Sequence, residues 1–392
     1  MRDDNPEDAF NDAAGLIDET IIGPYLFRGK IRVLGFAADS GKLEHFLKAY
    51  LNDQLEGSDF TFTLANEKAP LVYMLINDFK ELTGVRKKGI YRNRSCQFHI
   101  PVYCTDTKAP SEEQPTRGTL QVFSYGSNMQ NVLTSTEVRG PFMSHAGMNM
   151  KAWIEDLDGE APEQTLFTVS PQVLGPDKEV VNQCLISLEK TEDEGDPGVS
   201  RVPATNTQVL QDIGTIFAFK QFQHAKWPEK ACYQSLVKIT HKVVETPDEA
   251  AETPDGSAKP SKEPVEKTDV QECLRWKNLE DSEKLKMLRA RISRYEYHPI
   301  VDGLGLETES SDHEKITIAE ATGSTPEETK KVAFDIVKPV SYLVIDSCVE
   351  KKPSISFYEP PGETLCYRWF KTKDDSGWKP GPASGEKSKN GK

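Results

Sequence analysis

The sequence of 392 residues has no apolar run that approaches the length of a membrane-spanning helix, which takes about 18 residues. It has no G-x-G-x-x-G motif and no P-loop, the glycine-rich sequences that bind dinucleotides and nucleotide phosphates. It also has no H-x-x-x-H motif and no cluster of cysteines and histidines with the spacing of metal ligands. These absences predict a protein without a membrane segment, a cofactor or a metal.

Positive charge is scarce as well. The 48 lysines and arginines are outnumbered by 62 aspartates and glutamates, so the formal charge is −14 and the sequence pI is near 5.2. A protein that binds nucleic acid regardless of its sequence needs a basic face to neutralise the phosphates. We therefore expect no nucleic-acid partner.

Cysteine is present, but it forms no redox motif. The seven cysteines include no C-x-x-C pair, and most of them fall in strand-like apolar runs such as VVNQCLISL. An odd number of buried, unpaired thiols is typical of a reducing compartment. The N-terminus, MRDDNPEDAF, is acidic and lacks the apolar core of a signal peptide. A cytoplasmic protein is expected.

Apolar alternation, the pattern of β-strands, dominates the chain. The stretch 70–79 is apolar almost throughout, as a strand covered on both faces would be. Helical patterns are fewer: one covers 40–53, with Ser40 as a favourable N-cap, and another covers 271–293. Further strands are expected at 24–39, 60–65, 95–105, 118–125, 164–173, 179–189, 213–222, 232–244, 332–349, 354–358 and 364–370. The sequence therefore predicts a strand-rich α+β fold, with a large antiparallel sheet or closed barrel and a few peripheral helices.

Composition divides the chain into one domain and its appendages. Residues 1–20 are polar and acidic and indicate a flexible arm, whereas residues 21–370 carry the patterns of a single domain. Residues 245–266 contain almost nothing to bury, so we expect a disordered insertion within that domain. The tail at 371–392, which is rich in Gly, Lys, Ser and Pro, is expected to be disordered too.

The stretch 118–154 concentrates small, charged and turn-forming residues beside strong strands. A strand leads to a Gly-Ser-Asn break, a short helical pattern at 129–133 and the turn STEVRGPFM. Glu137 and Arg139 flank the Gly-Pro step of this turn. They form either an ion pair that holds the turn or part of a catalytic site. In the second case Glu137 would be a general acid or base, and a nearby cation would orient a carboxylate or an enolate.

Three stretches resemble the acetoacetate decarboxylase-like family. GPYLFRGKIRVLGFAADSGKLEHFL is similar to the family's opening strand, aspartate and first helix. YRNRSCQFHIPVYC is similar to its pY-x-E … I-x-V-P-V strand, and TSTEVRGPFMSHAGM to its G-R-E-x-x-G-x-P-K-K-x-A signature. YHPIVDGLGL is less closely similar to the family's late H-x-P-L-x-D-L-P-V loop. The resemblance implies a cone-shaped β-barrel, possible self-association and a lysine that forms a Schiff base with a β-keto acid.

This sequence departs from the family's signature at the reactive positions. Met143 falls where the family has its catalytic lysine, Ser144 where the neighbouring lysine stands, and Ser95 on the strand carboxylate. The family's N-terminal arginine falls near Arg28 to Lys30. A thioether cannot form an imine, so the resemblance implies a pocket with a different lining. Met143 would make its floor apolar, which suits a larger and more hydrophobic ligand than acetoacetate.

The expected site combines the residue patterns with the resemblance. Its catalytic candidates are Glu137, Arg139, Arg28 and Lys30. Its substrate-binding candidates are Tyr91, Arg92, Ser95, Tyr125, Met143, His145 and His298. Arg92 and Arg94 are further cations near the site, and the expected site contains neither a metal nor a cofactor.

Three functions fit these residues. The first is an acetoacetate decarboxylase-like enzyme of secondary metabolism, a lyase, cyclase or decarboxylase. It would act on a keto acid or polyketide-like small molecule by acid–base or electrostatic catalysis, without a lysine Schiff base. The second is a non-catalytic small-molecule-binding protein on the same scaffold. The third is a decarboxylase with a displaced lysine, Lys151. The tetrapeptide YGSN also resembles a loop of γ-glutamylcyclotransferases, but the other motifs of that family are missing.

Overall fold

The computed structural model describes the strands, the helices and their short connections. The described residues are 25–55, 58–84, 91–108, 115–136, 142–150, 153, 164–174, 180–182, 184–191, 206–223, 231–240, 273–278, 285, 287–294, 299–308, 334–348, 369–371 and 378–380. The expected arm at 1–20, the insertion at 245–266 and the strand at 354–358 lie outside them. Within the described residues, no helix is long and apolar enough to cross a membrane.

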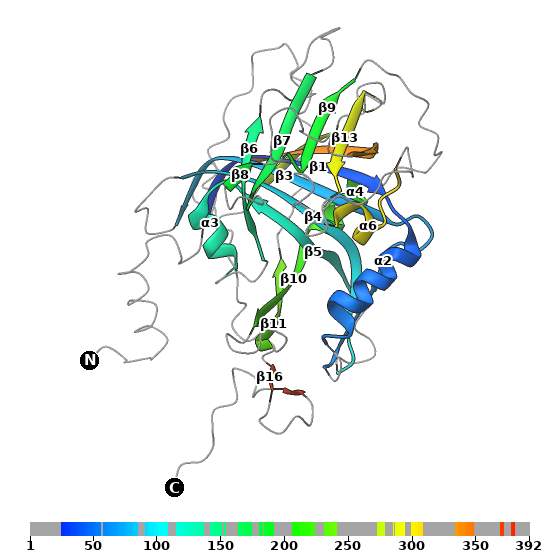
Figure 1. The fold of residues 1–392 in the computed structure, drawn as a ribbon. Helices are drawn as coiled ribbons and strands as arrows, with labels where there is room; N and C mark the ends of the chain where they lie inside the picture. The colour runs from blue at the N-terminus through cyan, green and yellow to red at the C-terminus, as the bar shows by residue number, and fades with distance from the viewer. Residues whose placement is uncertain are drawn as a thin grey trace, which may run out of the picture.

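The main sheet has the strand order β12–β15–β1–β3–β4–β5–β10–β11 (Figure 1). Its neighbours pair antiparallel, except that β5 and β10 run parallel. β2 pairs with the second half of β4, and β16 and β17 extend the sheet beyond β11. The strands are β1 Tyr25–Ala37, β2 Phe60–Leu64, β3 Leu71–Gly84, β4 Tyr91–Asp106, β5 Thr116–Gly126, β10 Thr215–Gln223, β11 Ala231–Thr240, β12 Cys273–Asn278, β15 Pro339–Cys348, β16 Trp369–Lys371 and β17 Trp378–Pro380.

A second group of strands, β6–β7–β9–β13–β14, stands over the main sheet (Figure 1). These strands are β6 Ser144–Met150, β7 Gln164–Leu174, β9 Ile186–Lys190, β13 Leu288–Ser293 and β14 Phe334–Val337, and the short β8, Val180–Asn182, pairs with β7. β6 joins the end of β5 in parallel, and β14 leads into β15 through Lys338.

These pairings confirm the predicted strand-rich α+β class with a large sheet. The sheet is mixed rather than antiparallel, because β5 has parallel partners in β6 and β10. The segment between β5 and β6 contains a helix and makes the long crossover that a parallel pair needs. The predicted closure into a barrel is not confirmed by the pairings of the described strands.

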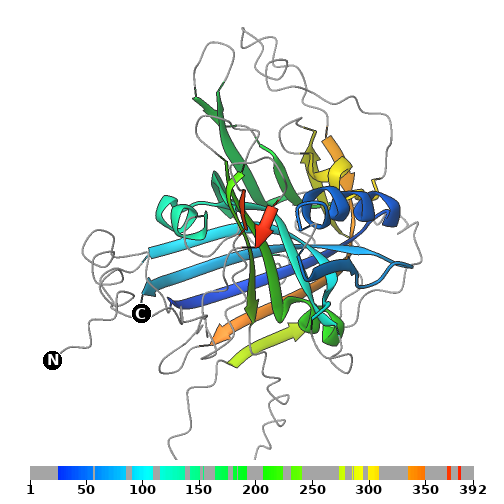
Figure 2. The same ribbon diagram turned by 90° about the horizontal axis from the view of Figure 1, so that it is seen from below.

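The helices are short. α2 (Ser40–Leu47) continues into a π-helical turn, η1 (Lys48–Asn52), and packs beside α6 (Ile300–Leu304). α3 (Met129–Thr134) lies at the opposite end of the central strands, as both views show (Figures 1 and 2). α2 begins one residue earlier than predicted: Asp39 is the N-cap, and its carboxylate accepts a hydrogen bond from the Lys42 amide.

The predicted helix at 271–293 is wrong. Its two ends form strands, β12 on the edge of the main sheet and β13 between β9 and β14. Leu288, Ala290 and Ile292 are buried in β13, which is the period of a strand and not of a helix. Leucines at near-helical spacing over the whole stretch obscured that local alternation.

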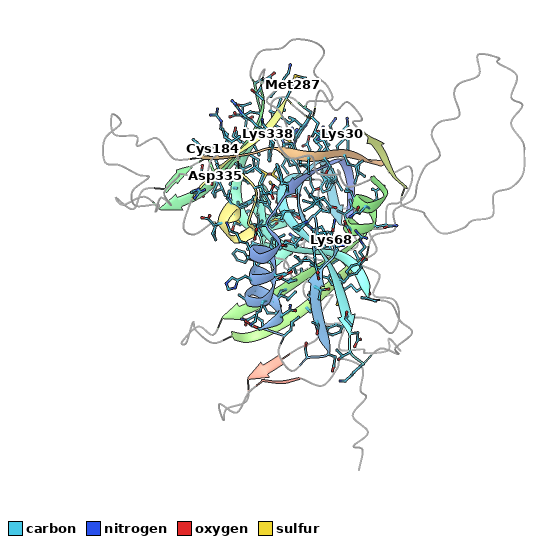
Figure 3. The ribbon with its side chains drawn as sticks, turned by 90° about the vertical axis from the view of Figure 1, so that its right-hand side faces the viewer. Lys30, Lys68, Cys184, Met287, Asp335 and Lys338 are labelled. Atoms are coloured by element: carbon cyan, nitrogen blue, oxygen red, sulfur yellow. The ribbon has the colours of Figure 1, made fainter. Side chains whose placement is uncertain are left out.

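The main sheet has a core face and an opposite face. On the core face, residues such as Leu34 and Met74 pack with Leu188 and Ile292 of the second strand group, and side chains fill the space between the two layers (Figure 3). The opposite face is apolar where α4 (Asn206–Ile213) packs on it, around Leu210. Beyond α4, the same face changes from apolar to polar side chains.

The described thiols are free, as predicted. Cys96 and Cys104 are buried and Cys184 is half-buried. Burial raises the pKa of Cys104 to about 12, and it also raises the pKa of Cys96 far above its usual range. Both thiols therefore stay protonated near neutral pH and act as core residues rather than nucleophiles.

Candidate functional site

A band of polar side chains crosses β3, β4 and β5 on the face opposite the core. The register places Asn77 opposite Ser95, Ser95 opposite Gly126, and His99 opposite Gln121. Directly paired residues share a face, and every second residue of a strand returns to it. We call this band the polar face. Its members are Asn77, Asn93, Ser95, Gln97, His99, Thr119, Gln121 and Ser124, all of them buried except the half-buried Gln97.

A hydrogen-bond chain runs along the polar face. His99 Nδ1 lies 3.0 Å from Thr119 Oγ1, and His99 Nε2 lies 3.2 Å from Gln97 Oε1. The amide oxygen can only accept, so Nε2 carries a proton and donates it to this oxygen, and Nδ1 shares a hydrogen bond with the threonine hydroxyl. Gln97 Nε2 and Asn77 Nδ2 then both donate to Ser95 Oγ, at 3.5 and 2.8 Å. Because Ser95 accepts two donors, its own hydroxyl hydrogen is polarised and available to a further acceptor.

Four buried polar atoms of this face have no hydrogen-bond partner in the described structure: Asn77 Oδ1, Asn93 Oδ1, Gln121 Nε2 and Ser124 Oγ. An unsatisfied buried donor or acceptor costs about 1–3 kcal/mol. Native proteins keep few such atoms, and those that persist usually serve a purpose. The four unsatisfied atoms on this face include both donors and acceptors, and a bound ligand could form hydrogen bonds with all of them.

Met143 and α3 close one end of the polar face. A Cβ at Gly126 would lie 2.6 Å from Met143 Sδ and 3.0 Å from a Val132 methyl group, so both side chains lie on this side of β5. Asn131 Nδ2 is 3.7 Å from the same sulfur, and Asn131 Oδ1 is another buried atom without a partner. Met143 is 4% exposed. The Met143 thioether, which aligns with the catalytic lysine of the family that the sequence resembles, is therefore packed beside Gly126, the strand partner of Ser95.

A charged network closes the other end. Tyr73, the strand partner of His99, donates to Asp212 of α4 at 2.8 Å, and Arg117 Nε donates to the same carboxylate at 2.5 Å. Burial, followed by the charge of Asp212, raises the pKa of Tyr73 well above its usual range, so the phenol remains a donor. Burial opposes the charge of Arg117, but its hydrogen bond to Asp212 and the attraction between the two outweigh this and raise its pKa. These contacts attach α4 to the edge of the polar face.

The structure brings together three of the predicted site residues. Ser95 and Met143 lie on the polar-face side, and His145 is on the same side because it pairs with Gly126. His145 Nδ1 is buried and has no partner in the described structure. Tyr125 instead points into the core, where it is 1% exposed, and burial raises the pKa of its phenol beyond its usual range.

Three of the predicted cations, Lys30, Arg92 and Arg94, lie elsewhere. Arg92 is exposed and 3.8 Å from Asp78, and Arg94 is 3.2 Å from the same carboxylate. Lys30 pairs with Asp78 in the sheet and thus belongs to the other side of β1 (Figure 3). The side chains of Arg28 and Tyr91 lie outside the described part of the structure. The same holds for four entire residues: Glu137, Arg139, Lys151 and His298.

Most residues of the polar face were not predicted from the sequence, although the sequence contains a pattern that indicates them. Asn77, Asn93, Gln121 and Ser124 alternate with apolar residues in strands that were correctly predicted. Buried polar residues in such strands point to a site when they meet on one face. Also missed was Arg32, which is 2% exposed on the core face with its guanidinium carbon 3.6 Å from the Trp153 ring centroid. Among the described residues, no group of three His, Cys, Asp or Glu side chains could hold a metal ion.

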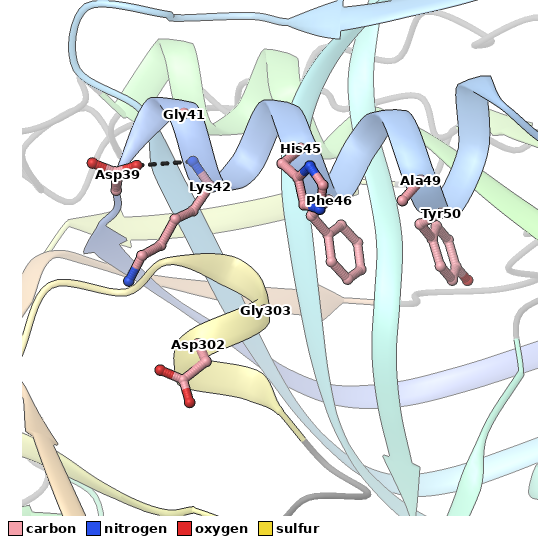
Figure 4. Close-up of a pocket in the computed structure, with 9 residues that line it drawn as sticks. All are labelled: Asp39, Gly41, Lys42, His45, Phe46, Ala49, Tyr50, Asp302 and Gly303. Carbon is pink, nitrogen blue, oxygen red and sulfur yellow. Dashed lines mark hydrogen bonds between the residues drawn. The ribbon is translucent and has the colours of Figure 1, made fainter. Parts of the chain in front are cut away.

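A separate cavity of about 730 Å³ lies between α2 and α6 (Figure 4). Phe46 and Tyr50 stack along it with ring centroids 5.2 Å apart, and His45 and Asp302 also line it (Figure 4). Tyr50 further contacts Phe219 of β10 at 6.2 Å between centroids. The aromatic residues therefore attach α2 to the core face, away from the polar face.

Tyr50 should make the protein less stable at alkaline pH. Burial raises its pKa from 10.0 to about 12, so between these values the unfolded chain loses the proton before the folded chain does. The folded state then binds more protons, and the free energy of unfolding falls as pH rises through this window. We expect Tyr50→Phe to show a smaller fall than the wild type in denaturant titrations. Each protein's free energy of unfolding at neutral pH is the reference for its own fall at alkaline pH. An equal fall in both proteins would contradict the assignment of the effect to Tyr50.

Comparison with solved structures finds distant neighbours. They include acetoacetate decarboxylase from Legionella pneumophila, with 13% identity and a TM-score of 0.34, where the match covers 56% of this chain and 66% of that one. The enduracididine biosynthesis enzyme MppR complexed with pyruvate has 12% identity and a TM-score of 0.33, covering 55% and 70%. A further acetoacetate decarboxylase has 10% identity and a TM-score of 0.39, covering 83% and 87%.

The resemblance predicted from the sequence is to the family named by these neighbours. No protein-family model matches the chain, and no curated protein matches it.

Proposed function

We propose that this chain is an acetoacetate decarboxylase-like protein that binds a keto acid or polyketide-like small molecule on the polar face and acts on it without a lysine imine. The observation that carries the proposal is the set of buried, unpartnered polar atoms on the polar face, one end of which Met143 closes. In this proposal the strands close into the family's cone-shaped barrel, and the ligand lies against β3, β4 and β5.

The polar atoms suit a ligand that carries both carbonyl and hydroxyl groups. Ser95, Ser124 and the Gln121 amide can donate to a carbonyl oxygen, whereas Asn77 Oδ1 and Asn93 Oδ1 can accept from a hydroxyl group. Closely spaced donors in a buried setting also stabilise the negative charge of an enolate, the intermediate of decarboxylation and of aldol-type cyclisation. Hydrogen bonding therefore replaces the covalent activation that a lysine would provide.

The acid–base part of the proposal concerns residues at the turn before Met143. Glu137 would move the proton at the carbon next to the carbonyl, with Arg139, Arg28 or Lys30 orienting an anionic group. Turnover that is abolished by Glu137→Gln but retained by Lys151→Met would support this mechanism. A borohydride-reduced adduct on Lys151 would instead support a displaced Schiff-base lysine and contradict it.

The polar face itself is tested by a matched pair of serines. Ser124→Ala removes an unpartnered hydroxyl, whereas Ser127→Ala removes one that already accepts from the Arg94 amide at 3.1 Å. We expect Ser124→Ala to weaken the binding of a keto compound by about fivefold to tenfold, and Ser127→Ala to leave affinity unchanged. Calorimetric titration with straight-chain γ-keto acids and their methyl esters would measure this. Equal affinities in all three proteins would contradict the assignment of the site.

A second candidate function is non-catalytic binding on the same scaffold. The eight members of the polar face include no aspartate, glutamate, lysine or arginine, and both ring nitrogens of His99 are engaged in hydrogen bonds. A face of this kind recognises a ligand without supplying a strong acid or base. Saturable binding of keto acids without any turnover, measured over a range of keto acids, would favour this function.

A further inference from the structure

The cavity between α2 and α6 lies apart from the polar face and has an aromatic wall of its own (Figure 4). Its volume of about 730 Å³ is within the range of cavities that bind small molecules. Phe46 and Tyr50 extend side by side along it, and their rings stack with 16° between the ring planes. The two rings also contact Phe123 and Phe219 of the main sheet. They are therefore held in place and give a ligand a flat apolar surface.

The hydroxyl group of Tyr50 is a polar group without a partner at this wall. It forms no hydrogen bond with a described residue, and burial is the only cause of the raised pKa of Tyr50. A tyrosine hydroxyl group that is removed from water usually finds a hydrogen-bond partner. Because Tyr50 lines the cavity, a bound molecule can be that partner.

The charged residues of the cavity differ in what they already bind. Asp39 is the N-cap of α2 and accepts a hydrogen bond from the Lys42 amide at 2.8 Å. Asp302 lies 3.9 Å from Arg294. The ammonium group of Lys42, by contrast, has no ion-pair partner among the described residues. Its side chain runs toward α6 (Figure 4) and packs against Gly305, where a Cβ would lie 2.8 Å from Lys42 Cβ and 3.2 Å from Lys42 Cδ. The charge that remains for a ligand is therefore positive.

We propose that this cavity binds a flat aromatic acid, whose ring lies on Phe46 and Tyr50 and whose carboxylate lies at Lys42. The site is separate from the polar face, and the inference does not depend on the proposed function. Lys42 and Tyr50 are eight residues apart, which is about 12 Å along an α-helix. A fused two-ring acid spans most of this distance. Stacking and burial supply the affinity, and Lys42 determines the preference for an acid over an amine.

The role of charge is tested with naphthalene that carries a carboxylate, a hydroxymethyl or an aminomethyl group at the same ring carbon. In calorimetric titrations the wild type should bind the acid most tightly and the amine most weakly. Lys42→Met retains the apolar stem against Gly305 and should weaken acid binding by about threefold to fivefold, with alcohol binding unchanged. Lys48→Met is the matched control, because Lys48 is exposed, pairs with Asp53 and does not line the cavity. It should leave all three affinities unchanged.

The place of binding is tested at Gly303, which lines the cavity on α6. A Cβ there would lie 3.8 Å from Phe46 Cδ2, an ordinary van der Waals distance, so Gly303→Ala should leave the affinities unchanged. Gly303→Leu places further atoms in the cavity and should abolish binding of all three naphthalene compounds, while binding of γ-keto acids stays unchanged. If circular dichroism shows that Gly303→Leu does not fold, Ala49→Trp takes its place, because Ala49 is an exposed lining residue.

Four outcomes would overturn the proposal. They are equal binding of acid and amine by the wild type, a preference for the acid that survives Lys42→Met, binding that survives when the cavity is filled, and no binding of any naphthalene compound. None of them bears on the proposed function, which is tested by the separate titrations with γ-keto acids.

Discussion

Replacing Asp212 by alanine is expected to lower the free energy of unfolding by about 3–5 kcal/mol. The carboxylate is 0% exposed and is the common acceptor for Arg117 and Tyr73. Its removal would leave a partly buried guanidinium and a buried phenol without their acceptor, and that loss costs far more than the pair itself contributes. Urea unfolding followed by fluorescence would measure the change.

The control is an exposed ion pair in the same protein. Lys48 and Asp53 form an ion pair on the surface at the end of α2, and their side chains are 68% and 50% exposed. Exposed pairs contribute about 0–1 kcal/mol, so Asp53→Ala should have little effect. A double substitution, Arg117→Met with Asp212→Leu, should recover part of the loss because no charge remains buried. Similar small effects for Asp212→Ala and Asp53→Ala would show that α4 is not held to the sheet in this way.

The second large effect is expected from Gly118→Ala, which would separate β5 from β10. A Cβ at Gly118 would lie 2.5 Å from the Thr215 carbonyl oxygen and 2.9 Å from Cε2 of Phe217. The carbonyl belongs to the backbone and cannot turn away, so the strands themselves must move. We expect a loss of about 1–3 kcal/mol from overpacking, and a larger loss for Gly118→Val.

Gly147→Ala is the matched control within another strand. There the nearest atom to the new Cβ would be the Ser170 carbonyl oxygen at 3.4 Å, and the position is exposed. We expect a change within about 0.5 kcal/mol. Thermal unfolding of the three proteins would rank them. Equal stability of Gly118→Ala and the wild type would mean that β10 is not packed closely against β5.

Met143 has a structural role where β5, β6 and α3 meet. The sulfur contacts Gly126 and Asn131, and the backbone amide of Met143 donates to Thr136 Oγ1 at 3.3 Å. These contacts hold the start of β6 beside the end of β5. Met143, which the sequence resemblance aligns with the family's reactive lysine, is thus part of the packing under α3, at one end of the polar face.

Local patterns predicted some features well and others not at all. The strands β3, β4 and β5, the first helix and the short α3 follow from alternation and capping, which depend on neighbouring residues only. The stretch that contains β12 and β13 failed because its leucines also fit a helical period, and only pairing with β15 and β9 selects the strand. The parallel pairing of β5 with β10 was not foreseen, since register between distant segments leaves no local pattern.

By itself, the sequence determined that this is a strand-rich chain. It also predicted Ser95, Met143 and His145 as site residues, and this remains a prediction. Only the tertiary structure decided that Asn77, Ser95 and Gln121 share one buried face, because strands far apart in the chain must pair in one register before their side chains can meet. The same physical reason applies to the parallel pairing of β5 with β10, which joins segments far apart in the chain.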